Sequence, residues 1–250
     1  MDRQLLAWPD RWLKLKRFCR KNCAVGPLSF ARLKAKGRDN RVLAEALSVN
    51  AAAHCIIRFE GNGNTVELGD LKIRGILKIV VCGDNNRVVI RDGTEIVSKL
   101  QMDIWQGCRE ASVTIDRGCT FWETAIRNTD HGSSVTIGEG SIFSKQTVIS
   151  NTDEHAILVD GQVINRAGAL RIGAHVWIGQ GASLMKNCVV PDGCIVARNA
   201  VVTHAFEAPR CVLAGMPARA VKHGVEWDLA PVNSFLDTCR SVRGNGSSED

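Results

Sequence analysis

The sequence predicts an all-β chain that winds as a parallel β-helix, and three repeating patterns support this prediction. Between residues 172 and 206, an aliphatic residue returns at every sixth position: Ile172, Ile178, Leu184, Val190, Val196 and Val202. A second row, four places after each of these, holds small or slender residues apart from Phe206: Val176, Ala182, Cys188, Cys194 and Ala200. Further upstream, short segments recur twenty-two residues apart.

A period of six matches neither the period of about 3.6 of a helix nor the period of about 2 of a flat strand. The backbone must therefore turn a corner after each short extended segment. Three such segments that close on one another form a triangular coil, with the recurring aliphatic side chain inside. Ordinary strands with a coincidental spacing are the alternative, but six successive matches in both rows favour the coil.

The earlier repeat is looser. NTVEL at 64–68 recurs as NRVVI at 86–90, and SVTI at 112–115 recurs at 134–137. Three hexapeptides make a coil of eighteen residues, so a spacing of twenty-two indicates a coil with about four extra residues at a corner. Residues 55–222 are therefore predicted to form one stacked unit in which each coil buries the surface of its neighbour.

Two segments carry a family resemblance. IGAHVWIG at 172–179 and LAGMPARAVK at 213–222 resemble the hexapeptide-repeat acyltransferases, and the likeness is densest from about Ile137 to Lys222. The resemblance implies a left-handed β-helix, a homotrimer and acetyl-CoA as co-substrate. The coil itself is predicted by the spacing, whereas its handedness, its assembly and its cofactor are implied only by the resemblance.

Length and composition set further limits. A chain of 250 residues has room for one domain with an appendage. Ten cysteines and no apolar signal segment favour reduced thiols in a cytoplasmic protein, with Cys188 and Cys194 as small inward residues. No segment approaches the ~20 apolar residues that cross a bilayer. Nucleic-acid binding is disfavoured because the basic segment lacks a readout motif.

Residues 1–54 are predicted to be a basic helical segment. Positions 1–50 contain twelve Lys or Arg against four Asp or Glu, while the rest of the chain is close to neutral. Residues 4–21 combine Trp, Leu and Phe with six basic residues, which indicates an amphipathic helix, and residues 30–50 suggest a second helix. Two interpretations stay open: peripheral attachment to anionic lipid at the inner membrane surface, or a cap over the first coil.

Two other segments do not fit the coil. Residues 150–170 cannot be threaded through the inward rows without burying a charge, so they are predicted to leave as a protruding loop. Loops on a rigid scaffold are common places for chemistry. Residues 223–250 form a short tail, whose end, RGNGSSED, has the composition of a disordered segment.

The loop contains the best candidate for a general base. Transfer of an acyl group from a thioester to a hydroxyl needs a proton acceptor and a donor for the oxyanion. An imidazole can take and return a proton near neutral pH, which favours His155. Asp153 or Glu154 could hold its tautomer, as a carboxylate does in hydrolase triads. His131 in NTDHGSS is the rival histidine.

A closer resemblance supports this choice. SNTDEHAI, VDGQVIN and HVWIG are similar to the loop and following coil of polysaccharide and polysialic acid O-acetyltransferases, which implies catalytic roles for His155 and Trp177. Trp177 is expected to point outward, where its N–H could donate to a carbonyl or its ring could stack on a sugar. Its alternative role is a contact between subunits.

Similarity to sugar O-acetyltransferases at VWIGQG, VARNAVVTH and GMPARAVK implies six positions that contact coenzyme A: Gln180, Arg198, Thr203, His204, Arg219 and Lys222. Arg198 stands where a small residue is usual and His204 where a lysine is usual. Gly179 and Gly181 are expected to leave a groove open for the pantetheine arm.

The sequence therefore predicts an acetyl-CoA-dependent O-acetyltransferase that modifies a sugar hydroxyl of a surface polysaccharide or its precursor, without a metal. Within the same class, an N-acetyltransferase for a nucleotide-sugar amine stays open. A non-catalytic β-helix scaffold is a further alternative. A zinc enzyme of the γ-carbonic anhydrase kind is disfavoured, because no two histidines lie five apart.

Overall fold

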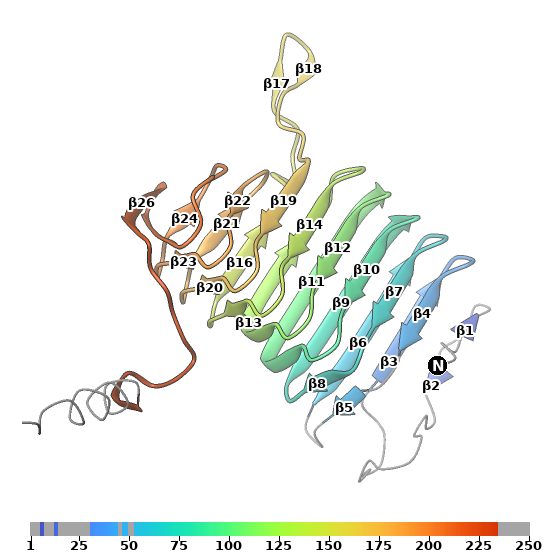
Figure 1. Ribbon diagram of the computed structural model, residues 1–250. Coiled ribbons are helices and arrows are strands. Elements are labelled where there is room, and N and C mark those ends of the chain that lie inside the picture. Colours follow the sequence, from blue (N-terminus) through green and yellow to red (C-terminus); the bar gives the residue numbers. More distant parts are fainter. Residues whose placement is uncertain (1–5, 8–12, 15–30, 45–46, 50–52, 235–250) are drawn as a thin grey trace, which may run out of the picture.

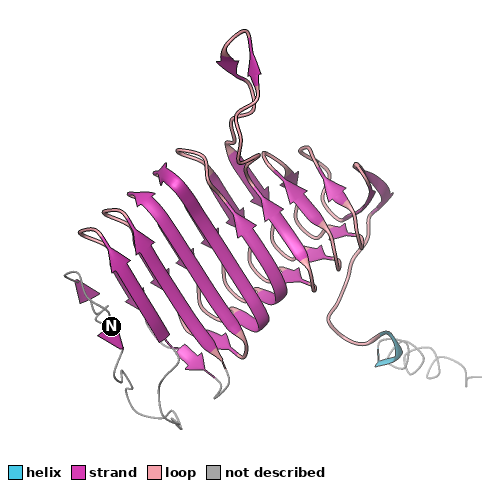
Figure 2. Cartoon of the chain, turned by 180° about the vertical axis from the view of Figure 1, so that it is seen from behind, coloured by secondary structure: helices cyan, strands magenta, loops and turns pink. Residues whose placement is uncertain are grey.

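A computed structural model describes residues 6–7, 13–14, 31–44, 47–49 and 53–234. It is a solenoid of β-strands whose coils stack in parallel. Figure 2 shows it built of strands and turns, and within the described ranges the only helical turn is at 232–234. The all-β prediction is confirmed, and so is the left-handed β-helical class, through the solved structures described below.

The stacked strands form three walls that follow one another around each coil. Wall 1 is one sheet, and its strands are β1 (Leu6–Ala7), β4 (Arg41–Ala44), β7 (Thr65–Leu68), β10 (Arg87–Ile90), β12 (Ser112–Ile115), β14 (Ser134–Ile137), β19 (Ala169–Ile172) and β22 (Val189–Val190).

Walls 2 and 3 belong to a second sheet that bends where long strands turn the corner between them. Wall 2 contains β5 (Leu47–Val49), β8 (Leu71–Ile73), the first parts of β11 (Glu95–Arg109) and β13 (Thr120–Arg127), β15 (Ile142–Phe143), β20 (Trp177–Ile178), β23 (Ile195–Val196), β25 (Cys211–Gly215) and β26 (Ala218–His223). Wall 3 contains β2 (Leu13–Lys14), β3 (Ala31–Lys36), β6 (His54–Glu60), β9 (Ile76–Asp84), the later parts of β11 and β13, β16 (Thr147–Ser150), β21 (Ser183–Met185) and β24 (Val201–Val202).

Both predicted repeats are present in the strand register. Ser112–Ile115 pairs residue for residue with Ser134–Ile137, and Thr65–Leu68 pairs in the same way with Arg87–Ile90. Between β20 and β23, and between β21 and β24, the repeat shortens to the eighteen residues of regular hexapeptides. A coil of either length therefore stacks on its neighbour, because the extra residues stay in the corners.

The two inward rows form the core as predicted. Every aliphatic residue of the six-residue row from Ile172 to Val202 is at most 2% exposed. The small residues of the second row are fully buried, and Phe206 packs only partly against the core. Burial raises the pKa of the Cys188 thiol to about 12, which fits its role as a small apolar side chain.

Buried asparagines add a feature that the sequence analysis did not anticipate. The Asn86 amide donates to the Asn64 side chain at 3.0 Å, and Asn64 donates to Asn40 at 2.9 Å. Asn86 also donates to the Cys108 carbonyl and accepts from the Ala111 N–H, each at 2.9 Å. This ladder satisfies backbone groups that the extra corner residues would otherwise leave buried without partners.

The predicted helix over residues 30–50 is wrong. Residues 31–36, 41–44 and 47–49 are strands, and β3 pairs in parallel with β6 along its whole length. Ala, Leu, Lys and Arg favour helices, but this propensity is outweighed here. Pairing with the next coil satisfies the backbone hydrogen bonds and buries Leu33 and Val42. The coil therefore begins well before residue 55.

The predicted helix over residues 4–21 falls mostly outside the described residues. The two pairs described there, β1 and β2, are short strands that pair antiparallel with β4 and β3 of the first coil. In the described part of the chain, no helix has the length and hydropathy that a membrane crossing requires.

We predict that Asn86→Ala lowers the free energy of unfolding by about 2–4 kcal/mol, because it leaves at least two buried backbone groups without partners. Chemical denaturation measures the change. Asn62→Ala, one coil away, is the matched control: its amide bonds to the Arg38 N–H and to Asp84, but at exposed positions where water can take its place, so the loss should be less than about 1 kcal/mol. Equal losses in the two variants would contradict a structural role for the ladder.

Candidate functional site

A hairpin leaves the coil between β16 and β19, at the corner where wall 3 gives way to wall 1. Its strands, β17 (Leu158–Val159) and β18 (Gln162–Val163), are antiparallel, and Figure 1 shows the hairpin projecting away from the coil. We call its point of departure the exit corner. His155 lies near the base of the hairpin, in the segment that rises from the exit corner.

A polar network fixes the hairpin at its exit. Thr129 Oγ1 donates to Thr152 Oγ1 at 2.6 Å, and Thr152 Oγ1 donates to the Asp130 carboxylate at 3.1 Å. The other oxygen of Asp130 accepts from the Ala167 N–H at 2.8 Å. Asp130 therefore ties together the outgoing and the returning arms of the hairpin.

Asp153 takes a different position from the one predicted for it. Its carboxylate accepts from the Lys186 ammonium and, at 2.8 Å, from the Asn165 amide. Asn165 also donates to the His155 carbonyl at 2.9 Å and accepts from the Ile157 N–H at 2.8 Å. Asp153 thus anchors the base of the hairpin to the coil, and Glu154 pairs with Arg127 at 3.3 Å. The predicted use of either carboxylate to hold the imidazole is not seen.

The Lys186 ammonium holds the pKa of the Asp153 carboxyl below its usual value of 3.8, with the Asn165 amide as a smaller cause in the same direction. A lowered pKa in the folded state stabilises the fold above the ordinary pKa. That contribution is lost as the pH falls through the folded value. The anchor is therefore intact at neutral pH and weakens only in strong acid.

His155 is exposed and borders a hollow of about 170 Å³ between the hairpin base and the exit corner. Its ring makes no hydrogen bond to any other described residue. In contrast, the Nδ1 atom of the rival His131 accepts from the Arg109 N–H at 3.0 Å. Of the two histidines, His155 therefore has the ring whose nitrogens are both free to face a substrate.

Trp177 lies on wall 2 and is 41% exposed, so the predicted outward orientation is observed. Its indole N–H donates to Ser144 Oγ over a long 3.4 Å. Trp227 of the tail lies beside it, with 6.1 Å between ring centroids. The sequence patterns did not single out Trp227. The available signal was the one tryptophan within residues 223–250.

Wall 2 also carries the two basic residues after the predicted turn. Trp177, Ile195, Val212 and Lys222 pair in succession across β20, β23, β25 and β26. Three strand spacings separate Trp177 from Lys222, which is about 14 Å. Arg219 lies on the same strand as Lys222, opposite Ala214, and both basic side chains are exposed.

The other four predicted cofactor positions lie at two corners. Gln180 and Arg198 follow β20 and β23, at the corner between walls 2 and 3, and Gln180 contacts Gln146 of the coil before it at 3.4 Å. Thr203 and His204 follow β24, which pairs with β21, the strand that Lys186 follows. They therefore lie at the same corner as Lys186, in the next coil. The His204 ring packs against Phe206 at 4.5 Å.

The structure gives the two glycines a packing role between coils. A Cβ on Gly179 would lie 2.7 Å from the Val196 carbonyl oxygen, and one on Gly181 would lie 2.2 Å from the Asn199 side chain. Gly179 is therefore required by the close approach of the next coil, and Gly181 also has a positive φ of 72°, which favours glycine.

Apart from Gln180 and Arg198, the predicted residues fall into two groups on opposite sides of the solenoid. Wall 2 carries Trp177, Arg219 and Lys222, whereas His155 lies at the exit corner and Thr203 and His204 lie at the same corner of a later coil. A triangular coil has each corner opposite one wall, and the exit corner is the one opposite wall 2. The packed interior therefore separates His155 from Trp177 within a single chain.

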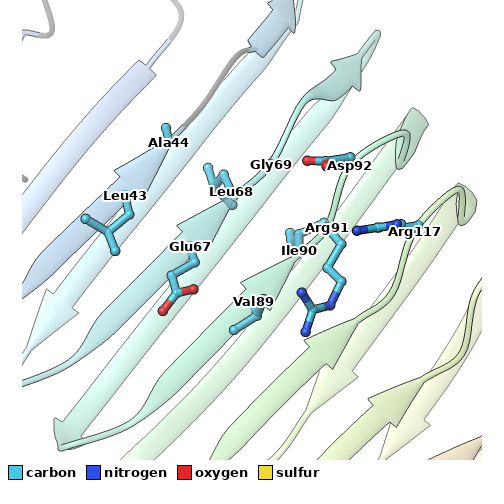
Figure 3. A pocket seen from close by; sticks show the side chains of 10 residues that line it. All are labelled: Leu43, Ala44, Glu67, Leu68, Gly69, Val89, Ile90, Arg91, Asp92 and Arg117. Atoms are coloured by element: carbon cyan, nitrogen blue, oxygen red, sulfur yellow. The ribbon is translucent and has the colours of Figure 1, made fainter. Parts of the chain in front are cut away.

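A larger open hollow of about 240 Å³ lies far from both groups, on wall 1 of the early coils (Figure 3). Two of its charged lining residues have ionic partners, since Glu67 pairs with Arg87 and Arg91 pairs with Asp116. We assign no chemistry to this hollow. Among the described residues, no group of His, Cys, Asp and Glu is arranged to hold a metal ion.

We predict that Lys186→Met loosens the hairpin base, because the Asp153 carboxylate loses its cation. Limited proteolysis should cut within residues 150–170 several-fold faster than in the unmodified protein. Lys72→Met, which removes an exposed lysine from an early coil of wall 2, should leave the cleavage rate unchanged. The anchor role would be contradicted if both variants were cut at the same rate.

No family model matches the chain. It is 27% identical over 200 residues to a polysialic acid O-acetyltransferase of Neisseria meningitidis, covering 71% of this chain and 91% of that protein. It is also 29% identical over 113 residues to a polysialic acid O-acetyltransferase of Escherichia coli O1:K1 / APEC, covering 43% and 36% of the two chains.

Two solved structures share the fold. The polySia-specific acetyltransferase NeuO superposes with a TM-score of 0.68 at 24% identity, covering 87% of this chain and 99% of that one. The polysialic acid O-acetyltransferase OatWY superposes with a TM-score of 0.68 at 25% identity, covering 85% and 98%. Together with the coil described above, these comparisons confirm the resemblance stated from the sequence: the chain is similar to polysialic acid O-acetyltransferases and shares the β-helical fold of these acyltransferases.

Proposed function

We propose that the protein is an acetyl-CoA-dependent O-acetyltransferase that acetylates a sugar hydroxyl of a polysaccharide. The observation that carries the proposal is the anchored hairpin, which presents an unengaged imidazole at the edge of a small hollow. The likeness to polysialic acid O-acetyltransferases over most of the chain supports the same chemistry. An amine acceptor would give an amide, so locating the new acetyl group in the product distinguishes the two.

In this mechanism His155 acts as the general base. Its imidazole takes the proton of the acceptor hydroxyl, and the oxygen attacks the thioester carbonyl carbon. The carbon–sulfur bond then breaks, and the imidazolium returns the proton to the departing thiolate sulfur. The Trp177 N–H is held only by a long bond to Ser144, so it is available to donate to the oxyanion.

The residues of wall 2 fit a coenzyme A molecule. Arg219 and Lys222 offer exposed cations for its phosphates. The distance of about 14 Å between the backbones of Lys222 and Trp177 suits an extended pantetheine arm. We propose that Gln180 and Arg198 border the same path from the neighbouring corner. Thr203 and His204 would meet the cofactor from the exit corner of another copy.

We further propose that the active form is a homotrimer with its sites between copies. The supporting observation is the separation of His155 from Trp177 by the interior of the coil. The exit corner of one copy placed against wall 2 of the next brings the imidazole to the thioester path. Rotational symmetry would then generate an equivalent site at each interface.

We predict that His155→Ala lowers the rate of acetyl transfer to a saccharide acceptor by roughly 10²–10⁴-fold, the usual contribution of a general base. Turnover of acetyl-CoA with a thiol reagent measures the rate, and calorimetry should find acetyl-CoA binding preserved. His131→Ala is the matched control and should keep most of the activity. Retention of most acetyl transfer by His155→Ala would refute the mechanism.

Replacing Arg219 and Lys222 together by alanine should raise the KM for acetyl-CoA about tenfold or more with a small effect on kcat, because both cations bind the part of the molecule that does not react. Arg171→Ala removes an exposed arginine from wall 1 and serves as the control. A fall in kcat with an unchanged KM would argue against this role.

A further inference from the structure

One corner position of the later coils is usually glycine, but in two coils it is not. Along wall 2, strand pairing runs in succession through Glu95, Thr120, Ile142, Trp177, Ile195 and Val212. The backbone φ is positive two residues before each of them, at Gly93, Gly118, Gly140, His175, Gly193 and Arg210. For His175 and Arg210 it is 51° and 52°. A residue with a Cβ is strained in this conformation, so the contacts of these two residues must offset the strain.

Both of these residues contact the tail. The Val225 N–H donates to the Arg210 carbonyl at 2.9 Å, and the Arg210 guanidinium donates to Glu226 at 3.1 Å. Two coils earlier, the Trp227 ring stacks on the His175 ring, with 4.0 Å between centroids and 5° between planes. The Trp227 indole N–H also donates to the His175 carbonyl at 2.9 Å. The side chains that replace glycine at this corner therefore hold the tail in place.

The tail strap, as we call residues 225–227, brings Trp227 to the reaction centre proposed above. Its ring centroid lies 6.1 Å from that of Trp177, and the two ring planes are inclined at 48°. This separation is within the range of tilted aromatic pairs. The Trp177 indole thus has one contact with the tail strap and another, a long bond of 3.4 Å, with Ser144 on the preceding strand.

We propose that Trp227 is a positioning residue for acetyl transfer. The tail strap holds its ring against the Trp177 indole, so that the indole N–H keeps the direction in which it meets the oxyanion. An indole on an open surface exchanges between rotamers, whereas a donor stabilises developing charge best when it is already aimed at it. This inference rests on the proposed function and adds to it a residue that acts through Trp177.

A cover for the last coil is the simpler role for the tail. That role needs the contacts at Arg210, which belongs to the last coil, but it does not need the tail to reach the coil of Trp177. Nor does it need His175, whose ring is the platform on which Trp227 stacks. In the proposed homotrimer this part of wall 2 borders the next copy, so a contact between subunits is the other role to be tested.

The test is a double-mutant cycle. Trp227→Ala should lower kcat roughly tenfold and change the KM for acetyl-CoA by less than about twofold, because the groups that bind the cofactor are untouched. Trp177→Phe removes the indole N–H and should lower kcat roughly 10²–10³-fold. The double variant should be no slower than Trp177→Phe alone, since Trp227 acts through that N–H. Trp227→Phe should recover most of kcat, because its ring can still stack on His175.

Thiol release from acetyl-CoA measures the rate, with oligomers of sialic acid, galacturonic acid and glucose as acceptors and the fastest of them used throughout. Leu229→Ala is the matched control. Leu229 is 78% exposed and lies just beyond the tail strap, so its loss should leave kcat unchanged. Sedimentation of each variant reports the oligomeric state.

Circular dichroism tests the aromatic pair without catalysis. Two indole rings at this separation couple their ultraviolet transitions and give paired bands of opposite sign. Trp177→Ala and Trp227→Ala should remove the same pair of bands, and Leu229→Ala should keep it.

Three results would each overturn the proposal: an unchanged kcat in Trp227→Ala, an equal further loss when Trp227→Ala is added to Trp177→Phe, or dissociation of the oligomer by Trp227→Ala. All three leave the enzymatic proposal standing. If no acceptor supports thiol release while the paired bands are present, the enzymatic proposal is removed together with the role of Trp227 in transfer, and only the docked tail strap remains.

Discussion

Parallel pairing between successive coils is the constraint on which the rest of this structure depends. Most strands contain only two to four residues, so no coil is stable alone. Each coil satisfies its backbone groups and buries its side chains only by matching the coil before it and the coil after it. The matching is kept where coil length changes from twenty-two to eighteen residues, because corners absorb the difference.

The corners therefore determine how much the length of a coil can vary within the solenoid. Where they are long, buried asparagines donate to neighbouring carbonyls and to each other. Where they are short, glycines let the next coil approach closely, as at Gly179. The exit corner is the extreme case, because it releases a complete hairpin and still restores the stacking at β19. Asp130 accepts a hydrogen bond from the returning arm, and Lys186 donates one to it. These two contacts fix the position from which the hairpin leaves the coil.

The two ends of the solenoid have backbone groups that no further coil can pair. A parallel solenoid exposes unpaired backbone groups at its first and last coils, which invites association with other chains. At the C-terminal end, β26 turns back and pairs antiparallel with β25. The tail then runs back along the coil and places Trp227 against His175. The last coil is thereby covered, and an aromatic side chain from outside the repeat joins wall 2.

The sequence by itself determined the coil, its inward rows and the stretch that leaves it. Both inward rows from Ile172 to Ala200 are buried as predicted, because a six-residue period admits only one way of facing the interior. Together with the family resemblance it also proposed His155, Trp177, Arg219 and Lys222 as candidates for the chemistry. It failed at residues 30–50, where strong helix formers become strands because the partner that overrides their propensity lies in the next coil.

Only the tertiary structure decided which wall or corner of the solenoid each of those residues occupies. Sequence distance does not tell which wall or corner a residue occupies, so it could not show that His155 and Trp177 lie on opposite sides of the interior. Nor could it assign Asp153 to Lys186, thirty-three residues away, or bring Trp227 beside Trp177. Such contacts depend on which coils lie next to each other and where the tail runs, and a local pattern does not contain that information.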